Sequence, residues 1–465
     1  MLTYSFANIG SDSLYIHLYK CIKNDIINGV LSTGVKLPSK RSFAKNLGIS
    51  TITVETAYEQ LRAEGYIYSI PKKGFFIADV TGIALIKSKP QTQTAHCVEN
   101  YSRYVSDFIS NLTNPDNFPF SVWARLMREV MAEKQDELVR PSPCGGLREL
   151  RLAICSHLRQ FRSMSVEPDQ VIIGAGTEYL YGLLIQLLGR EKIYAVENPG
   201  YKKIYQIYKS NGVNCSYISL DDFGIDVQEL ELSNAEIVHI SPSHHYPTGK
   251  VTPVSRRYEL LGWASKSKNR YIIEDDYDSE FRLTGKPIPT MQSIDVSEKV
   301  IYMNTFTKSL ASTIRVSYMV LPPHLLEKFY KDLSFYSCTV SNFEQFTLAR
   351  FISGGWFEKH INRMRNYYRG VRDTLLEQIK TSPLSEKVSI SEEEAGLHFL
   401  MKVDTDCNDE ELIRRAETNG IRISCLSQYY YSTCNIAQEH TVIINYSGLH
   451  SENACQAIRL LNEII

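Results

Sequence analysis

The stretch VSEKVIYMNTFTKSLASTIRVSYMVLP, residues 296–322, places Lys308 directly after an apolar run that predicts a buried strand. Thr305 and Thr307 lie beside this lysine, and Arg315 follows seven residues later. Most lysines are solvated surface residues, so Lys308 would carry little weight alone. A lysine that forms a Schiff base needs a partly desolvated site, and hydroxyl and guanidinium donors suit a phosphate. The stretch therefore predicts a cofactor-anchoring lysine next to a phosphate site.

A second apolar run, Tyr271–Ile273 in RYIIEDDYDSEF, ends in an acidic cluster 33 residues before Lys308. Parallel α/β sheets place ligand sites at such strand ends. A carboxylate there can pair with a protonated pyridine nitrogen, and Asp275 is our candidate. The alternative is a magnesium site made by Asp275, Asp276 and Asp278. The position of the cluster relative to the lysine favours the pyridine interpretation, and we expect no metal.

Two further motifs suit the same site. QVIIGAGTEYLYGLLIQLL, residues 170–188, predicts a strand, a glycine loop at Gly176 and Thr177, and a helix whose first N–H groups can hold a phosphate. It lacks the third glycine of a dinucleotide-binding fingerprint. In YAVENPGYKKIY, Tyr201 follows a strand, where its ring could stack on a planar cofactor or simply pack.

The rest of the chain fits two folded regions. From about Phe108 to the end, apolar β-runs alternate with amphipathic helical stretches, which predicts an α/β domain with a mainly parallel sheet over 108–465. Residues 12–78 predict a small module, and the polar stretch 79–107 a linker. The ten dispersed cysteines indicate reduced thiols in the cytoplasm. We expect no signal peptide and no membrane span, since no apolar run approaches roughly 18 residues.

The N-terminal module is predicted to contain three helices and a hairpin. Ser39 is suited to cap a helix Ser39–Leu47, and Ser50 a helix that runs to Glu64. The first helix, ended near Gly29, is indicated by Tyr15, Leu18, Ile22 and Ile26 at helical spacing. The tight LGIS turn between two helices is typical of a helix-turn-helix, and YIYSI-PKKG-FFIA of a β-hairpin wing. A small three-helix packing element is the alternative.

KLPSKRSFAKNLGISTITVETAYEQLRAEGYI, residues 36–67, resembles the GntR-family winged helix-turn-helix DNA-binding domain along its whole length. The resemblance implies that Arg41 contacts a guanine and that Lys40, Lys72 and Lys73 neutralise phosphates of double-stranded operator DNA. Most relatives have arginine where this chain has Thr51. The expected DNA-binding residues are Ser39, Lys40, Arg41, Ser50, Thr51, Thr53, Lys72 and Lys73.

The remaining motifs, in this order, resemble fold-type-I aminotransferases and, more closely, the MocR subgroup of GntR regulators. SPSHHYPTG, SRRYELLGWA, IIEDDYDSEF and AGLHF carry that resemblance. It implies pyridoxal 5'-phosphate as cofactor, Lys308 forming the internal aldimine, Asp275 on the pyridine nitrogen, Tyr277 on the phenolic oxygen and Tyr201 stacked on the ring. The residues expected around the phosphate are Gly176, Thr177, Thr305, Thr307 and Arg315.

One departure concerns Tyr246-Pro247-Thr248-Gly249, since aminotransferases carry Asn-Pro-Thr-Gly there. His244 either substitutes for the missing asparagine or is structural. The γ-aminobutyrate-sensing relatives grip the effector carboxylate with two arginines, and the resemblance puts Lys203 and Gln428 at those positions. Because this pair is weaker, we do not expect that effector; another amine, a dipeptide-like ligand or pyridoxal phosphate itself remains open.

Two functions compete. The first is an active aminotransferase with an accessory DNA-binding domain. The second is a regulator in which an amine displaces Lys308 from the cofactor and changes DNA affinity. We expect the second, with residual half-transamination compatible with it, because a metabolic enzyme has no use for a DNA-binding module. The family also implies a domain-swapped, head-to-tail homodimer.

Overall fold

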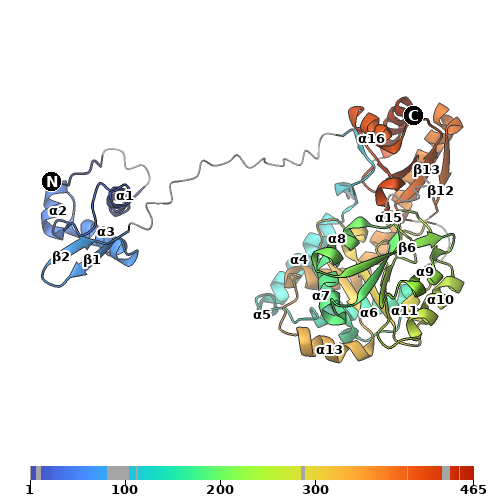
Figure 1. Ribbon diagram of the computed structural model, residues 1–465, viewed down its shortest axis with the longest axis horizontal. Helices are drawn as coiled ribbons and strands as arrows, with labels where there is room; N and C mark the ends of the chain where they lie inside the picture. The colour runs from blue at the N-terminus through green and yellow to red at the C-terminus, as the bar shows by residue number, and fades with distance from the viewer. Residues whose placement is uncertain are drawn as a thin grey trace. The chain divides into compact units, whose positions relative to one another are not determined.

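The computed structural model describes residues 2–6, 12–80, 104–110, 114–283, 288–394, 396–431, 440–449 and 451–465. The chain divides into two compact units, Met1–Glu99 and Asn100–Ile465 (Figure 1). Most of the predicted linker, residues 81–103, lies outside the described residues. No helix of the described part is long and apolar enough to cross a membrane.

The N-terminal unit is a three-helix module followed by a two-stranded hairpin. Its elements are α1 (Leu14–Ile27), α2 (Lys40–Leu47), α3 (Thr51–Ala63), β1 (Ile67–Ile70) and β2 (Gly74–Ile77). Ser39 Oγ accepts from Ser42 N and Ser50 Oγ from Thr53 N, so both serines cap their helices as predicted. Leu18, Ile22 and Ile26 are buried in its core. Tyr15, which shares their helical spacing, is exposed.

The wing pairs β1 with β2 in antiparallel register from Ile67↔Ile77 to Ile70↔Gly74. Lys72 in the connecting turn has φ 63°, and Gly74 has φ 112°. Both values lie in the left-handed region, which lets the chain reverse over few residues. The hairpin is therefore as the alternating sequence predicts.

The second unit is built on an eight-stranded sheet in the order β4-β11-β10-β9-β8-β5-β6-β7, with parallel pairing from β10 through β6. The strands β4 and β11 at one edge and β7 at the other pair in antiparallel fashion. Their bounds are β4 Val171–Gly174, β5 Ile193–Asn198, β6 Asn214–Asp221, β7 Gly224–Ile225, β8 Ile237–Ile240, β9 Tyr271–Asp275, β10 Val300–Thr305 and β11 Ser317–Val320. The mainly parallel sheet expected from the sequence is confirmed.

Helices cover both faces of this sheet (Figure 1). In β10, Ile301 and Met303 pack with the helices on one face, while Tyr302 and Val300 pack on the other. The first face carries α7 (Thr177–Leu188), α8 (Lys202–Ser210) and α13 (Pro323–Leu333). The second carries α6 (Arg148–Arg162), α9 (Val227–Leu232), α10 (Val254–Ser265), α11 (Met291–Ile294) and α14 (Asn342–Ser353). Because helices cover both faces of the sheet, the residues on both sides of a strand such as β10 are buried.

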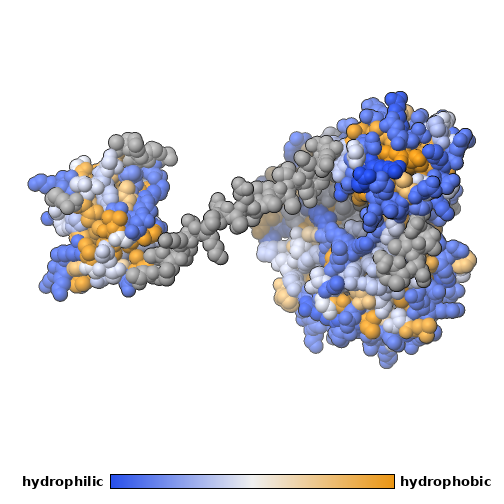
Figure 2. Space-filling model, turned by 45° about the horizontal axis from the view of Figure 1, so that its top comes forward, coloured by the Kyte–Doolittle hydropathy of each residue, from blue (hydrophilic) through white to orange (hydrophobic). Residues whose placement is uncertain are grey.

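The C-terminal part forms a smaller subdomain around an antiparallel sheet in the order β12-β13-β16-β15. The long helix α15 packs against it with α17, and α16 completes the layer (Figure 1). The bounds are α15 Trp356–Thr381, β12 Val388–Ser391, β13 His398–Val403, α16 Asp409–Thr418, β14 Ile421–Arg422, β15 Ser424–Cys425, β16 Thr441–Asn445 and α17 Ala454–Ile464. The short β14 pairs with β3 (Ser106–Asp107), and α4 (Phe120–Glu133), α5 (Gln135–Leu138) and α12 (Phe306–Ser309) complete the elements. The visible face of this unit is largely hydrophilic (Figure 2).

Candidate functional site

A cavity of about 380 Å³ lies at the carboxyl ends of the parallel strands β5, β8, β9 and β10. This is the position at which open α/β sheets bind their ligands. Eight of the nine predicted cofactor-binding residues line it, all but Gly176, as do Lys203 and several tyrosines. The eight are the predicted anchor Lys308 together with Thr177, Tyr201, Asp275, Tyr277, Thr305, Thr307 and Arg315.

Lys308 lies in α12, the short helix that directly follows β10. Thr305 caps this helix by accepting a hydrogen bond from Thr307 N over 3.2 Å. Burial lowers the pKa of Lys308 to about 8, although the negative charge of Asp278 opposes the shift. A larger share of its amine is therefore neutral near physiological pH, which is the form that attacks a carbonyl.

Asp275 is the last residue of β9, and in the described part of the chain only one of its two carboxylate oxygens has hydrogen-bond partners. Its Oδ2 accepts a hydrogen bond from Tyr181 Oη over 2.5 Å and lies 3.3 Å from Nε2 of His239. Tyr208 Oη lies 2.6 Å from Nδ1 of the same histidine. Because a carboxylate oxygen accepts, a neutral His239 in this arrangement carries its proton on Nε2 and accepts from the Tyr208 hydroxyl at Nδ1.

The other carboxylate oxygen, Asp275 Oδ1, is buried and has no hydrogen-bond partner among the described residues. A buried acceptor without a partner costs free energy unless a ligand supplies the donor. The protonated nitrogen of a pyridine ring is such a donor. Asp275 therefore fits the cofactor that the sequence predicts.

The phosphate end is formed by the start of α7 and by Arg315. Gly176 has φ 88°, and a Cβ on this residue would collide with the Arg315 guanidinium. Glycine thus lets the guanidinium lie against the backbone that precedes Thr177, where helix N–H groups are available to an anion. The hydroxyls of Thr305 and Thr307 lie 2.9 Å apart on the same side.

Sequence reasoning missed a carboxylate at this end, Glu178. Its Oε2 forms an ion pair with Arg315 Nη2 over 3.1 Å, and its Oε1 forms a second ion pair with Lys203. The signal was present, because Glu178 directly follows Thr177 in the predicted phosphate loop. The sequence could also have identified Tyr181, since it lies four residues after Thr177 and hence on the same helix face.

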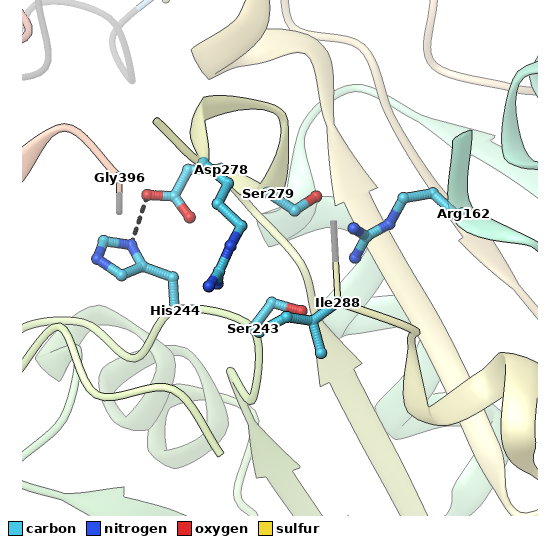
Figure 3. Close-up of a pocket in the computed structure, with 8 residues that line it drawn as sticks. Arg162, Ser243, His244, Asp278, Ser279, Ile288 and Gly396 are labelled. Carbon is cyan, nitrogen blue, oxygen red and sulfur yellow. Dashed lines mark hydrogen bonds and ion pairs between the residues drawn. The ribbon is translucent and has the colours of Figure 1, made fainter. Parts of the chain in front are cut away.

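Tyr277 lies next to a buried histidine–carboxylate pair, shown with its neighbours in Figure 3. His244 Nδ1 lies 2.8 Å from Asp278 Oδ2 and 3.2 Å from Tyr277 Oη. Gly396 has φ 73°, and the His244 ring fills the space that a Cβ on Gly396 would need. His244 is therefore placed to orient the tyrosine that the family pattern puts on the cofactor's phenolic oxygen.

The three aspartates considered for magnesium have separate partners. Asp276 forms a buried ion pair with Arg162 and accepts from Tyr302 Oη over 2.7 Å. Asp278 pairs with His244, while Asp275 faces the cavity. Among the described residues no group of three or more His, Cys, Asp or Glu is arranged to hold a metal ion. These partners favour the pyridine interpretation of Asp275.

The two predicted effector residues differ in position. Lys203 lines the cavity, but Gln428 is not among its lining residues. The Gln428 side chain accepts a hydrogen bond from Cys425 N over 3.1 Å, within its own turn. Its neighbours Tyr429 and Tyr431 line the cavity instead.

In the winged helix, Arg41, Thr51, Lys72 and Lys73 are exposed, as DNA contacts require. Lys40 forms an ion pair with Glu55 over 2.5 Å. Ser39 and Ser50 are helix caps, and the Thr53 hydroxyl lies 2.8 Å from that of Ser50. Contacts of these residues with DNA stay predictions.

Comparison with known proteins agrees with both units. Residues 109–459 match the family described as aminotransferase class I and II, and residues 14–77 match the gntR family of bacterial regulatory proteins. The uncharacterized HTH-type transcriptional regulator YdeL of Bacillus subtilis is 38% identical over 96% of both chains. The probable rhizopine catabolism regulatory protein MocR of Rhizobium meliloti is 29% identical over 96% of this chain and 93% of its own.

Among solved structures, kynurenine aminotransferase of Pyrococcus horikoshii superimposes with a TM-score of 0.68 and 25% identity, over 78% of this chain and 91% of the other. The second unit thus has the aminotransferase fold, which binds pyridoxal phosphate. The chain belongs to the MocR subfamily of transcriptional regulators, which join a gntR-type helix-turn-helix domain to a class I and II aminotransferase domain.

Proposed function

We propose that this regulator senses a small primary amine in the Lys308 cavity and changes its affinity for operator DNA in response. The observation that carries the proposal is the preserved cofactor set, Lys308 with Asp275 and the phosphate donors, in a chain with a well-formed winged helix. A sensor needs an effector that binds two conformations with different affinity. Reversible chemistry at Lys308 supplies such an effector site.

Pyridoxal phosphate, when bound, supplies a carbonyl that reacts reversibly with primary amines and a ring that withdraws electrons. Lys308 would bring a nucleophilic amine to this carbonyl, and Asp275 Oδ1 would accept a hydrogen bond from the ring nitrogen. Tyr277 would contact the phenolic oxygen, and Tyr201 would pack on the ring. The phosphate donors in this proposal are Gly176, Thr177, Thr305, Thr307 and Arg315.

On the DNA side, Arg41 reads a base and the exposed wing lysines Lys72 and Lys73 neutralise phosphates. A domain-swapped, head-to-tail homodimer would present two winged helices to repeated half-sites. In this proposal Lys203 contacts the effector. Because Gln428 hydrogen-bonds within its own turn and does not line the cavity, its neighbours Tyr429 and Tyr431 take its place beside the effector. Pyridoxal phosphate itself is the second effector candidate.

An active aminotransferase is the competing function, because the cavity contains both the lysine and the ring-nitrogen carboxylate that transamination uses. The two functions make different predictions for the full-length protein. A sensor shows an amine-dependent change in affinity for specific DNA with few turnovers. An enzyme shows sustained turnover that is independent of DNA.

The test combines the visible absorbance of the cofactor with gel retardation of DNA from the region upstream of the gene. Lys308→Ala should abolish the amine response in both readouts, whereas Lys380→Ala, at an exposed lysine in the last turn of α15, should not. Multiple-turnover transamination without any specific DNA shift would overturn the regulatory function.

A further inference from the structure

Glu178 lies between two cations at the cofactor cavity. One of its carboxylate oxygens pairs with Lys203 and the other lies 3.1 Å from Arg315 Nη2. These ion pairs lower the pKa of Glu178, with the Lys203 hydrogen bond as the largest cause. Glu178 is therefore ionised at neutral pH, and it shares its charge between the phosphate clamp and the effector position.

Phosphate binding removes one of these partners. The Arg315 guanidinium is the bidentate donor that a phosphate takes up, and a dianion there repels the Glu178 carboxylate. Glu178 then has Lys203 as its remaining partner. Lys203 is in turn neutralised by a carboxylate of the protein, so it offers little attraction to a carboxylate on the effector.

No other described cation lining the cavity replaces it. Besides Lys203, the cationic side chains there are Lys308, which reacts with the cofactor, and Arg315, which holds the phosphate. Aromatic and aliphatic side chains make up much of the rest of the lining, among them Tyr201, Tyr246, Tyr429, Tyr431, Ile204 and Ile207. The hydroxyls of Tyr246 and Tyr429 form a hydrogen bond with each other over 2.9 Å.

Aromatic faces and a nearby carboxylate favour uncharged or cationic groups over anionic ones. We propose that Glu178 determines effector specificity by neutralising Lys203, so that the effector is a primary amine whose far end is uncharged or cationic rather than a carboxylate. This inference rests on the proposed sensing function. It deepens that function by assigning the chemical class of the ligand.

The test uses three amines with the same four-carbon chain on the full-length protein loaded with cofactor: 1-butylamine, 1,4-diaminobutane and 4-aminobutyrate. Apparent dissociation constants come from the change in visible absorbance and, independently, from the amine dependence of DNA retardation. We expect 4-aminobutyrate to bind most weakly to the wild type. Glu178→Gln should strengthen it by about fivefold, the scale of an exposed ion pair, and leave 1-butylamine unchanged.

Two variants control this result. Glu178→Gln combined with Lys203→Gln should lose the gain for 4-aminobutyrate, because the released lysine is the source of the attraction. Glu191→Gln, at an exposed carboxylate beyond the end of α7 and outside the cavity lining, should behave as wild type. In the cofactor-free protein, Glu178→Gln should also bind inorganic phosphate up to about fivefold more tightly in a thermal-shift titration, since Arg315 is released.

Tightest binding of 4-aminobutyrate to the wild type, or an unchanged affinity for 4-aminobutyrate in Glu178→Gln, would overturn the role of Glu178 and leave amine sensing standing. A normal cofactor band that responds to none of the three amines would overturn both proposals.

Discussion

The hydroxyl of Tyr181 donates a hydrogen bond to Oδ2 of Asp275 over 2.5 Å. Tyr181 lies one turn after Thr177, so a single helix, α7, supports the cofactor site at both its phosphate end and its ring-nitrogen end. The hydrogen bond thereby links α7 to the carboxylate that we propose for the ring nitrogen. The sequence analysis predicted the contribution of α7 to the phosphate end, through Thr177, but not its contribution to the ring-nitrogen end, through Tyr181.

Tyr181→Phe should weaken cofactor binding by about tenfold, because a hydrogen bond to a charged group contributes about 1.5–3 kcal/mol and His239 retains part of the support. Titration of the cofactor-free protein with pyridoxal phosphate, followed by absorbance, measures the dissociation constant. Tyr179→Phe in the same helix is the matched control. Equal affinity in the two variants would contradict the supporting role of Tyr181.

The fold was largely predictable because its signals are local. Serine caps, apolar runs and the alternating wing determine α2, α3, β9, β10 and the hairpin before any tertiary contact forms. Candidate site residues at strand ends followed from the same logic. Helical spacing alone did not show which apolar residues of α1 are buried, since Tyr15 is exposed.

The partners of the site residues were not predictable in the same way. The support of Asp275 by Tyr181 and His239 joins residues that are far apart in sequence and on different elements. Nothing in the apolar strand β8 marks His239 as a functional residue. The Gln428 assignment came from aligned position alone, which carries no information on where a side chain points.

Cofactor uptake should depend on pH through Lys308, whose pKa burial lowers to about 8. Below this value the fraction of Lys308 that is in the reactive neutral form rises about tenfold per pH unit, and well above it nearly all of the amine is neutral. The uptake rate should therefore rise up to about pH 8 and then level off. Stopped-flow absorbance on cofactor-free protein measures this rate. A midpoint at the ordinary lysine value near 10.5 would contradict the buried, desolvated position.

Gly396→Ala should disturb the cofactor environment, whereas Gly212→Ala should not. Both glycines have positive φ, 73° and 77°, so both variants incur a backbone cost of about 1–2 kcal/mol. Only at Gly396 would the new methyl group collide with His244, the residue in contact with Tyr277. We expect a shifted visible absorbance band and a larger loss of thermal stability for Gly396→Ala alone; identical spectra would argue against the His244–Tyr277 contact.

Arg41→Ala should cost about 1–3 kcal/mol at one base pair and relax the sequence preference there, because a bidentate base contact carries specificity. Binding of a set of single-base operator variants, measured at fixed salt, checks this expectation. Lys73→Ala is the comparison, since loss of a phosphate contact weakens all sequences alike. An unchanged preference at every position in Arg41→Ala would exclude it as a base-reading residue.

Lys40 forms an ion pair with Glu55 on the neighbouring helix α3, over 2.5 Å, and we expect this carboxylate to compete with a DNA phosphate for the lysine. Glu55→Gln removes that competitor and one negative charge beside the expected backbone contact. DNA affinity should therefore rise, and the slope of log affinity against log salt should steepen by up to about one unit, because one more phosphate is neutralised. Glu59→Gln, at an exposed position four residues further along the same helix, controls for the general charge change. If the two variants show the same affinity and salt slope, Lys40 does not reach a phosphate.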